Sequence, residues 1–186
     1  VQTCALPISH VSNGLDDYIQ DLINNPIGQV GIPTGVPAYD HAIGGGLRKS
    51  TINVIAARPK TGKTLLADNM GFYIANKLKI PVLNLDTEMT KEDHLNRLLA
   101  MITEIEISKI ETGKFNESTV SNQKIEEAIK DLKETPLYYK PIPGKPFEEQ
   151  LSIMKRWVVK EVGLNADGSA KPCVIFYDYL KLMDSA

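Results

Sequence analysis

Apolar positions near the amino terminus follow a helical spacing that ends at a proline. The side chains that recur three and four positions apart are Leu15, Ile19, Leu22 and Ile23. This spacing predicts a short helix within residues 13–26, followed by a linker rich in glycine and proline over residues 26–37. Residues 9–30 are therefore expected to form a linker helix and linker outside the main domain.

From residue 51 onward, continuous apolar runs alternate with amphipathic segments. The run TINVIAA, residues 51–57, is typical of a strand buried in a parallel sheet, and we take it as the first strand. Further strands are expected at 82–86, 136–140 and 173–180, and helices at 63–79, 91–102, 108–113, 118–134 and 146–163. Strands alternating with helices predict an α/β fold with an open, mostly parallel sheet flanked by helices.

Composition places few limits on function. The chain has 186 residues and a formal net charge of -2, so no overall basic field indicates nucleic acid, although a local basic loop could still bind it. No apolar stretch approaches the roughly 18 residues of a membrane span, and no export signal is visible, so we expect a cytoplasmic protein without a membrane partner. The few cysteines and histidines match no metal-ligand spacing, so no metal site built from them is expected.

The two ends of the chain carry separate expectations. The first eight residues, VQTCALPI, resemble the translation of a common sequencing adapter, so we expect residues 1–8 to be a library artefact and exclude them from the fold. The chain stops eight residues after Asp178, so the domain over residues 31–186 is expected to be partial.

The junction after the first expected strand has the spacing of a phosphate-binding loop. The usual pattern is a glycine, four residues and then Gly-Lys-Ser/Thr between a strand and a helix, and here Ala57 replaces the first glycine. Gly62 would let the backbone approach a phosphate, Lys63 would reach the β- and γ-oxygens, and Thr64 could bind Mg²⁺. The residues expected to bind ATP are Ala57, Arg58, Pro59, Lys60, Thr61, Gly62, Lys63, Thr64 and Leu65.

Acidic side chains end two of the expected strands. VIFYD ends in Asp178, which is expected to hold Mg²⁺ as the Walker B acid at the carboxyl edge of the sheet. LDTEM presents Asp86 and Glu88 at the same edge, where either acid could orient and polarise water. We favour Glu88 over Asp86, although spacing alone does not decide between them, because either acid could instead be a helix cap.

Taken in order, the motifs resemble those of the DnaB-type replicative helicases. AARPKTGKT resembles the phosphate loop of that family, and LDTEM, NRLLA, SKIETG and FYDYLKLM resemble later motifs of its RecA-like motor domain. The resemblance covers about residues 31–184 and implies a RecA-like P-loop NTPase core, truncated here after the Walker B strand.

The resemblance also implies an activity: an ATP-dependent motor that moves 5'-to-3' on single-stranded DNA and unwinds duplex DNA. By this resemblance, Glu88 would activate the attacking water and Lys63 would be the second catalytic residue. Thr64 would bind ATP and Mg²⁺, and Asp178 would be the Walker B acid. Identical subunits would form a hexameric ring in the cytoplasm of a bacterial or phage-infected cell, with primase and a helicase loader as further partners.

Some questions stay open at the level of sequence. The helix within residues 13–26 either docks on an adjacent subunit or packs on its own domain. The channel loops, sensor glutamine and trans arginine of the family are expected beyond Asp178, so this chain alone is expected to bind ATP weakly and to unwind nothing. A RecA- or KaiC-like ATPase, suggested by GGGL before the loop strand, and a nucleotide-binding module without helicase activity are the alternatives.

Overall fold

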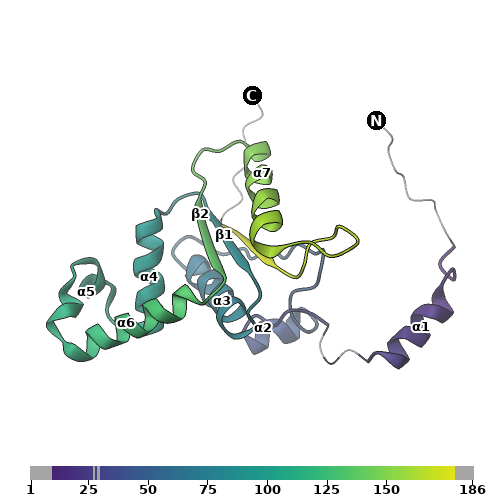
Figure 1. Ribbon diagram of the computed structural model, residues 1–186, viewed down its shortest axis with the longest axis horizontal. Coiled ribbons are helices and arrows are strands. Elements are labelled where there is room, and N and C mark those ends of the chain that lie inside the picture. Colours follow the sequence, from purple (N-terminus) through teal and green to yellow (C-terminus); the bar gives the residue numbers. More distant parts are fainter. Residues whose placement is uncertain (1–9, 27, 29, 179–186) are drawn as a thin grey trace.

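The computed structural model describes residues 10–26, 28 and 30–178, so the expectation about residues 1–8 lies outside the described residues. A parallel sheet in the order β2-β1-β3 forms its centre (Figure 1). The strands are β1 (Val82–Asp86), β2 (Leu137–Pro141) and β3 (Val174–Asp178). The helices are α1 (Leu15–Asn24), α2 (Pro37–Ala42), α3 (Lys63–Lys77), α4 (Lys91–Thr103), α5 (Ile107–Glu111), the 3₁₀ turn η1 (Lys114–Glu117), α6 (Thr119–Lys133), α7 (Phe147–Trp157) and the π turn η2 (Val158–Val162).

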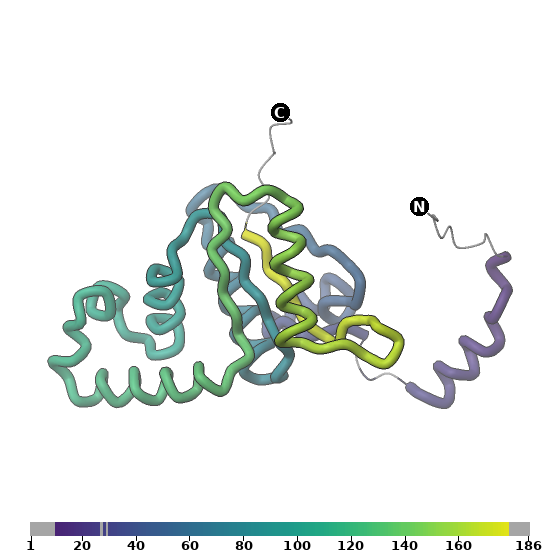
Figure 2. The backbone as a smooth tube through the Cα atoms, turned by 45° about the horizontal axis from the view of Figure 1, so that its top comes forward, coloured from purple at the N-terminus to yellow at the C-terminus, as the bar shows by residue number. Residues whose placement is uncertain are grey.

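Side chains of β1 alternate between two helical layers, because successive residues of a strand point to opposite faces of the sheet. Leu83 and Leu85 pack in one apolar cluster with Trp157 at the end of α7. Val82 packs in another with Ile74 of α3. The sheet therefore lies between α3 and α7, which Figures 1 and 2 show on its two sides. This three-layer arrangement confirms the predicted α/β class and parallel sheet.

Helices α4, α5 and α6 form an extension beside the sheet (Figure 1). Their own apolar cluster contains Ile105, Ile110 and Ile125. Helix α4 begins after Thr90, whose Oγ1 accepts the Asp93 amide at 3.1 Å, so the cap predicted from TKED is confirmed. Helix α1 is confirmed too, but none of its residues is buried and Figure 1 draws it apart from the sheet.

The predicted first strand is wrong. Residues 51–57 carry no strand, and Ile52 and Val54 are 91% and 71% exposed. An apolar run indicates that a segment can be buried, but a strand also needs neighbouring backbone groups to bond with, and composition does not say where those lie. Here the places on both sides of β1 are taken by β2 and β3, and residues 51–57 join no ladder. The strand-helix-strand unit expected from residues 51–57 through α3 to β1 is therefore not formed.

The core around β1 supports a stability prediction. Leu85→Ala is expected to lower the free energy of unfolding by about 2–5 kcal/mol, because Leu85 is 1% exposed and its truncation leaves a cavity. Trp157, the single tryptophan of the chain, lies in the same cluster and can report urea unfolding by fluorescence. Val120→Ala, at a position 64% exposed on α6, is the control and should change stability by less than about 0.5 kcal/mol. Equal urea midpoints for Leu85→Ala and the wild type would contradict the packing of Leu85 in this core.

Candidate active site

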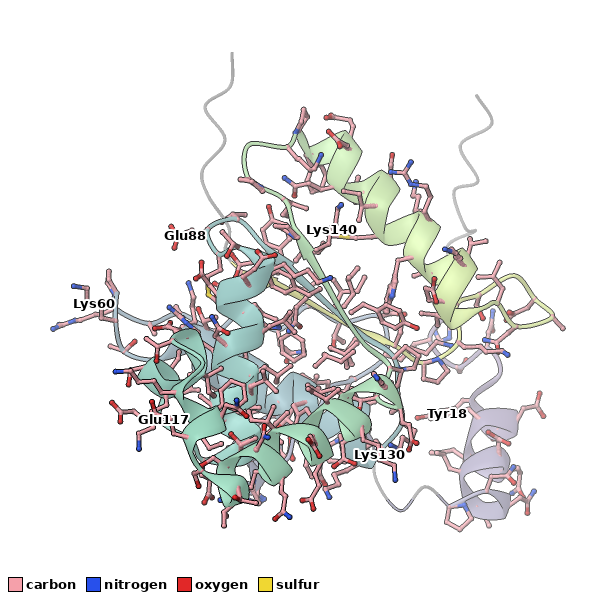
Figure 3. The ribbon with its side chains drawn as sticks, turned by 60° about the vertical axis from the view of Figure 1, so that its left-hand side comes forward. Tyr18, Lys60, Glu88, Glu117, Lys130 and Lys140 are labelled. Atoms are coloured by element: carbon pink, nitrogen blue, oxygen red, sulfur yellow. The ribbon has the colours of Figure 1, made fainter. Side chains whose placement is uncertain are left out.

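The loop before α3 ends in a glycine whose conformation suits a phosphate site. Gly62 is the N-cap of α3 with φ 94°, a left-handed conformation that favours glycine, and no side chain caps the helix there. The amides of the first turn of α3 lie at the positive end of the helix dipole, which favours an anion. Lys60, also at positive φ, projects from the exposed loop in Figure 3.

Three side chains predicted to bind ATP and Mg²⁺ meet where α3 begins and β3 ends. Lys63 Nζ lies 3.0 Å from Asp178 Oδ1, and Thr64 Oγ1 donates a hydrogen bond to Asp178 Oδ2 at 2.5 Å. These three residues are partly exposed. The fold therefore brings together residues that lie far apart in the chain, and the sequence motifs predicted this convergence.

Asp86 and Glu88 lie at the same edge but in different environments. Asp86 is the partner of Asp178 in the parallel register, is 4% exposed, and accepts the amides of Glu88 and Met89 on Oδ1. Glu88 is exposed and lies on the same side of the molecule as Lys60 in Figure 3. Burial and two backbone donors leave Asp86 poorly placed to meet an incoming water, whereas the Glu88 side chain is accessible.

The donor set at this edge fits a hard divalent cation. Mg²⁺ prefers oxygen ligands, and the Thr64 hydroxyl and the Asp178 carboxylate supply them side by side. Among the residues that the structure describes, no group of three or more histidine, cysteine or acidic side chains could hold a metal ion. A cation held by Thr64 and Asp178 would therefore complete its shell with phosphate oxygens and water.

Sequence reasoning missed a buried polar cluster behind this edge. Asn84 Nδ2 donates to Asp68 Oδ1 at 3.5 Å, and His94 Nδ1 lies 3.6 Å from the same oxygen. The His94 ring stacks on Tyr139, with 4.1 Å between ring centroids and 13° between planes. Asp68, Asn84, His94 and Tyr139 come from α3, β1, α4 and β2, and no spacing in the sequence links them.

Burial shifts the pKa of both ionisable groups in the cluster toward their neutral forms. It raises the pKa of Asp68 to about 7, with a further contribution from nearby Asp86 that Arg97 opposes. It lowers the pKa of His94 to about 4, although Asp86 acts in the opposite direction. At pH values between these two, Asp68 is protonated and His94 is neutral.

The two shifts affect stability in opposite directions. Between pH 3.8 and about 7, the folded chain keeps the Asp68 proton that the unfolded chain releases, so the contribution of Asp68 to stability falls as pH rises. Between pH of about 4 and 6.5, the unfolded chain binds a His94 proton that the folded chain does not, so the contribution of His94 rises with pH. The two slopes oppose each other over most of this range.

Asp68→Asn is expected to unmask the contribution of His94. Relative to the wild type, its free energy of unfolding should fall by roughly 2–3 kcal/mol more as pH drops from 6.5 to about 4, because the variant lacks the stability that protonated Asp68 adds over this range. His94→Leu should show the reverse, gaining stability relative to the wild type over the same drop in pH. Urea unfolding at a series of pH values measures both, and parallel pH profiles in the three proteins would contradict the shifts.

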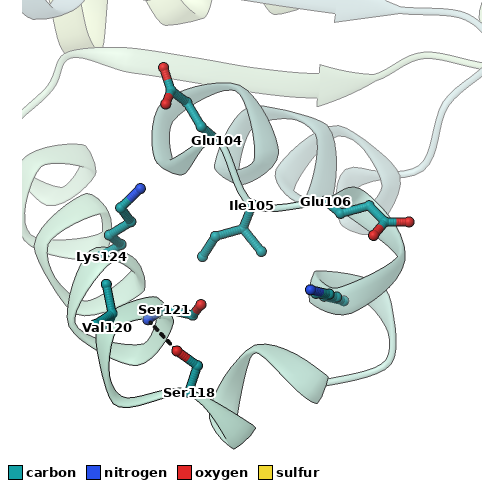
Figure 4. A pocket seen from close by; sticks show the side chains of 8 residues that line it. Glu104, Ile105, Glu106, Ser118, Val120, Ser121 and Lys124 are labelled. Atoms are coloured by element: carbon teal, nitrogen blue, oxygen red, sulfur yellow. Dashed lines mark hydrogen bonds between the residues drawn. The ribbon is translucent and has the colours of Figure 1, made fainter.

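Cavities also lie outside the edge where α3 begins and β3 ends. One, of about 360 Å³, is open to solvent and is bordered by the end of α4, α5 and the start of α6, with Ile105 and Lys124 in its lining (Figure 4). Another, of about 330 Å³, is lined by Asp68, Arg97 and Leu65 among others. Leu65, predicted to bind ATP, is 56% exposed and borders this second cavity at the first turn of α3.

The parallel sheet, with the glycine-capped helix α3 and a strand-end aspartate at its carboxyl edge, has a RecA-like α/β fold. Two solved structures share this fold at 19% sequence identity. One, described as an ATPase domain, aligns with a TM-score of 0.74 over 93% of this chain and 58% of that chain. The other, a DnaB-like replicative helicase studied with primase, aligns with a TM-score of 0.71 over 93% of this chain and 39% of that chain.

The chain belongs to the DnaB-like helicase family, whose C-terminal domain profile matches residues 31–186. Replicative DNA helicase DnaB of Treponema pallidum is 31% identical over 176 residues, which are 91% of this chain and 37% of that protein. The protein of the same name from Nostoc sp. is 29% identical over 177 residues, 94% of this chain and 19% of its own length. The chain thus spans less than two fifths of either relative.

The family assignment confirms the helicase ATPase family that the sequence motifs predicted. The described helices include none that is both long and apolar enough to cross a membrane.

Proposed function

We propose that this chain is the motor part of a replicative DNA helicase, which hydrolyses ATP with Mg²⁺ and couples hydrolysis to movement along single-stranded DNA and to duplex unwinding. The observation that carries the proposal is the meeting of Lys63, Thr64 and Asp178 at one edge of the sheet, in a chain of the DnaB-like helicase family. Its relatives are named replicative DNA helicases.

In this proposal the loop from Ala57 to Leu65 surrounds the phosphates. Amides at the start of α3 and the Lys63 ammonium would neutralise the β- and γ-phosphates, and Thr64 and Asp178 would hold the metal. Bound Mg²⁺ would supply further charge neutralisation to the phosphates. Glu88, exposed at the same edge, would orient the attacking water and accept its proton.

The proposal includes a ring of identical subunits. Helix α1 presents apolar side chains to solvent and buries none of them, which favours docking on a neighbouring subunit over packing on its own domain. We further propose hexameric assembly in the cytoplasm, with single-stranded DNA in the ring and primase and a helicase loader as partners. These features rest on membership in the family.

The test is hydrolysis of Mg·ATP by the complete gene product, with and without single-stranded DNA, together with strand displacement on a forked duplex. The proposal expects hydrolysis stimulated by single-stranded DNA, displacement that requires ATP, and loss of both when the metal is chelated. DNA-independent hydrolysis without displacement would favour a RecA- or KaiC-like ATPase instead. Nucleotide binding without hydrolysis would favour a nucleotide-binding module.

A further inference from the structure

The loop that carries Glu88 is anchored by side chains and backbone from all three strands. It runs from the end of β1 to Thr90, the cap of α4. The Glu88 and Met89 amides donate to a single oxygen, Oδ1 of Asp86, at 2.7 and 2.8 Å. An aspartate that accepts amides two and three residues ahead fixes the backbone of a turn.

The other two strands hold the residues on either side of Glu88. From β3, the backbone carbonyl of Asp178 accepts the Thr87 amide at 2.9 Å. From β2, the Tyr139 hydroxyl donates to the Met89 carbonyl at 2.9 Å. The backbone before and after Glu88 is thus tied to different strands, while its own side chain extends from an exposed position.

Tyr139 is itself held in place. Its ring stacks on His94, which is 3% exposed and belongs to α4, the helix that follows the loop. Burial also raises the pKa of Tyr139, whose hydroxyl donates to the Met89 carbonyl. Through Tyr139, the buried cluster therefore contacts the backbone of the loop that carries Glu88.

We propose that Asp86 and Tyr139 are positioning residues, which fix the backbone at Glu88 so that its carboxylate meets the attacking water. This inference rests on the proposed function, in which Glu88 activates that water. Neither residue touches the reacting atoms in this proposal; each acts through the loop. Since a displacement of about 1 Å can cost on the order of a hundredfold in rate, loss of the anchors should appear in kcat.

The kinetic test compares four variants of the complete gene product. Asp86→Ala removes the acceptor of both amides and should lower kcat by on the order of a hundredfold, with the Kd for Mg·ATP changed less than about threefold. Asp86→Asn keeps an oxygen acceptor and should retain most of the wild-type kcat. Tyr139→Phe removes one hydroxyl and should lower kcat by about three- to tenfold. Tyr138→Phe is the matched control, because the Tyr138 hydroxyl donates to Glu161 Oε2, outside the site, and kcat should not change.

Three kinetic outcomes would overturn the inference. Full activity in Asp86→Ala would show that the anchor is dispensable. An Asp86→Asn variant as inactive as Asp86→Ala would show that the acid itself, rather than its acceptor oxygen, is required. A higher KM with unchanged kcat in Tyr139→Phe would argue against a role in placing Glu88.

Amide hydrogen exchange on this chain separates the inference from the proposed function, since it needs no hydrolysis. In Asp86→Ala, the amides of Glu88 and Met89 should exchange faster than in the wild type. In Tyr139→Phe, the amide of Thr90 or Met89 should exchange faster. In both variants, amides within β1 and α3 should keep their protection. Unchanged exchange at the loop overturns the anchoring. Faster exchange in a protein whose wild type lacks ATPase activity would overturn the proposed function and leave the anchoring supported. Because Tyr139→Phe and Asp86→Asn are nearly isosteric, these two variants keep the test informative should Asp86→Ala fold poorly.

Discussion

Lys63→Ala is expected to abolish ATP turnover in the complete gene product, with a fall in kcat of at least a hundred- to a thousandfold, on the order of the loss of one transition-state charge donor. Lys63 is the cation at the start of α3 and lies 3.0 Å from Asp178 Oδ1. In the proposed site its ammonium turns to the β- and γ-oxygens, where negative charge shifts during hydrolysis. Steady-state release of phosphate measures the effect.

The control for this variant is Lys77→Ala. Lys77 is exposed in the last turn of the same helix, far from its N-terminus, so its removal tests the loss of one lysine from α3 without touching the loop. Fold stability of Lys63→Ala should change by less than about 1 kcal/mol, because its ion pair is partly solvated. Turnover within about threefold of wild type in Lys63→Ala would contradict the proposed phosphate site.

Glu88→Gln is expected to reduce turnover by a similar or larger factor while Mg·ATP binding is retained. The amide keeps the size of the side chain and loses the carboxylate that would accept the proton of the attacking water. The anchors of the loop involve the backbone of Glu88 and not its side chain, so the substitution should leave the loop in place. Titration with a fluorescent ATP analogue gives binding, and single-turnover hydrolysis gives chemistry.

The matched control here is Glu92→Gln. Glu92 is an exposed acid in the first turn of α4, shortly after Glu88, and its substitution makes the same change in net charge. This variant should hydrolyse ATP at the wild-type rate. Turnover that survives Glu88→Gln and disappears in Asp86→Asn would move the role of base to Asp86, in spite of its burial.

Most helices could be predicted from the sequence because their apolar positions repeat at the helical period, and three of the four expected strands could be predicted from short apolar runs between the helices. Helix α4 had the further signal of the Thr90 cap, and the strand that ends in Asp178 had a continuous apolar run. Residues 51–57 have the same kind of run but no ladder. Burial tendency is a local property of a segment, whereas hydrogen-bond partners depend on where the rest of the chain lies.

The candidate site divides in the same way. The sequence predicts that Lys63 and Thr64 lie near Asp178. The reason is that the carboxyl ends of parallel strands and the helix that follows a loop meet at one edge of the sheet. Asp86 had a readable signal, since an aspartate before Thr-Glu-Met suits an aspartate turn. The contacts of Asp68, His94 and Tyr139 had none, because each sits on a different element and only the packed fold brings them within reach.

The exposed run at residues 51–57 has a consequence for handling the protein. Its β-branched and apolar side chains, with Ile52 and Val54 open to solvent, form a short segment with the composition of self-associating strands. Strand β3 pairs with β1 and with no other strand among the described residues, so one of its edges also offers backbone groups for pairing. Concentrated samples would thus be prone to intermolecular strand pairing. A partner that covers residues 51–57 would also fix the backbone that leads into the phosphate loop.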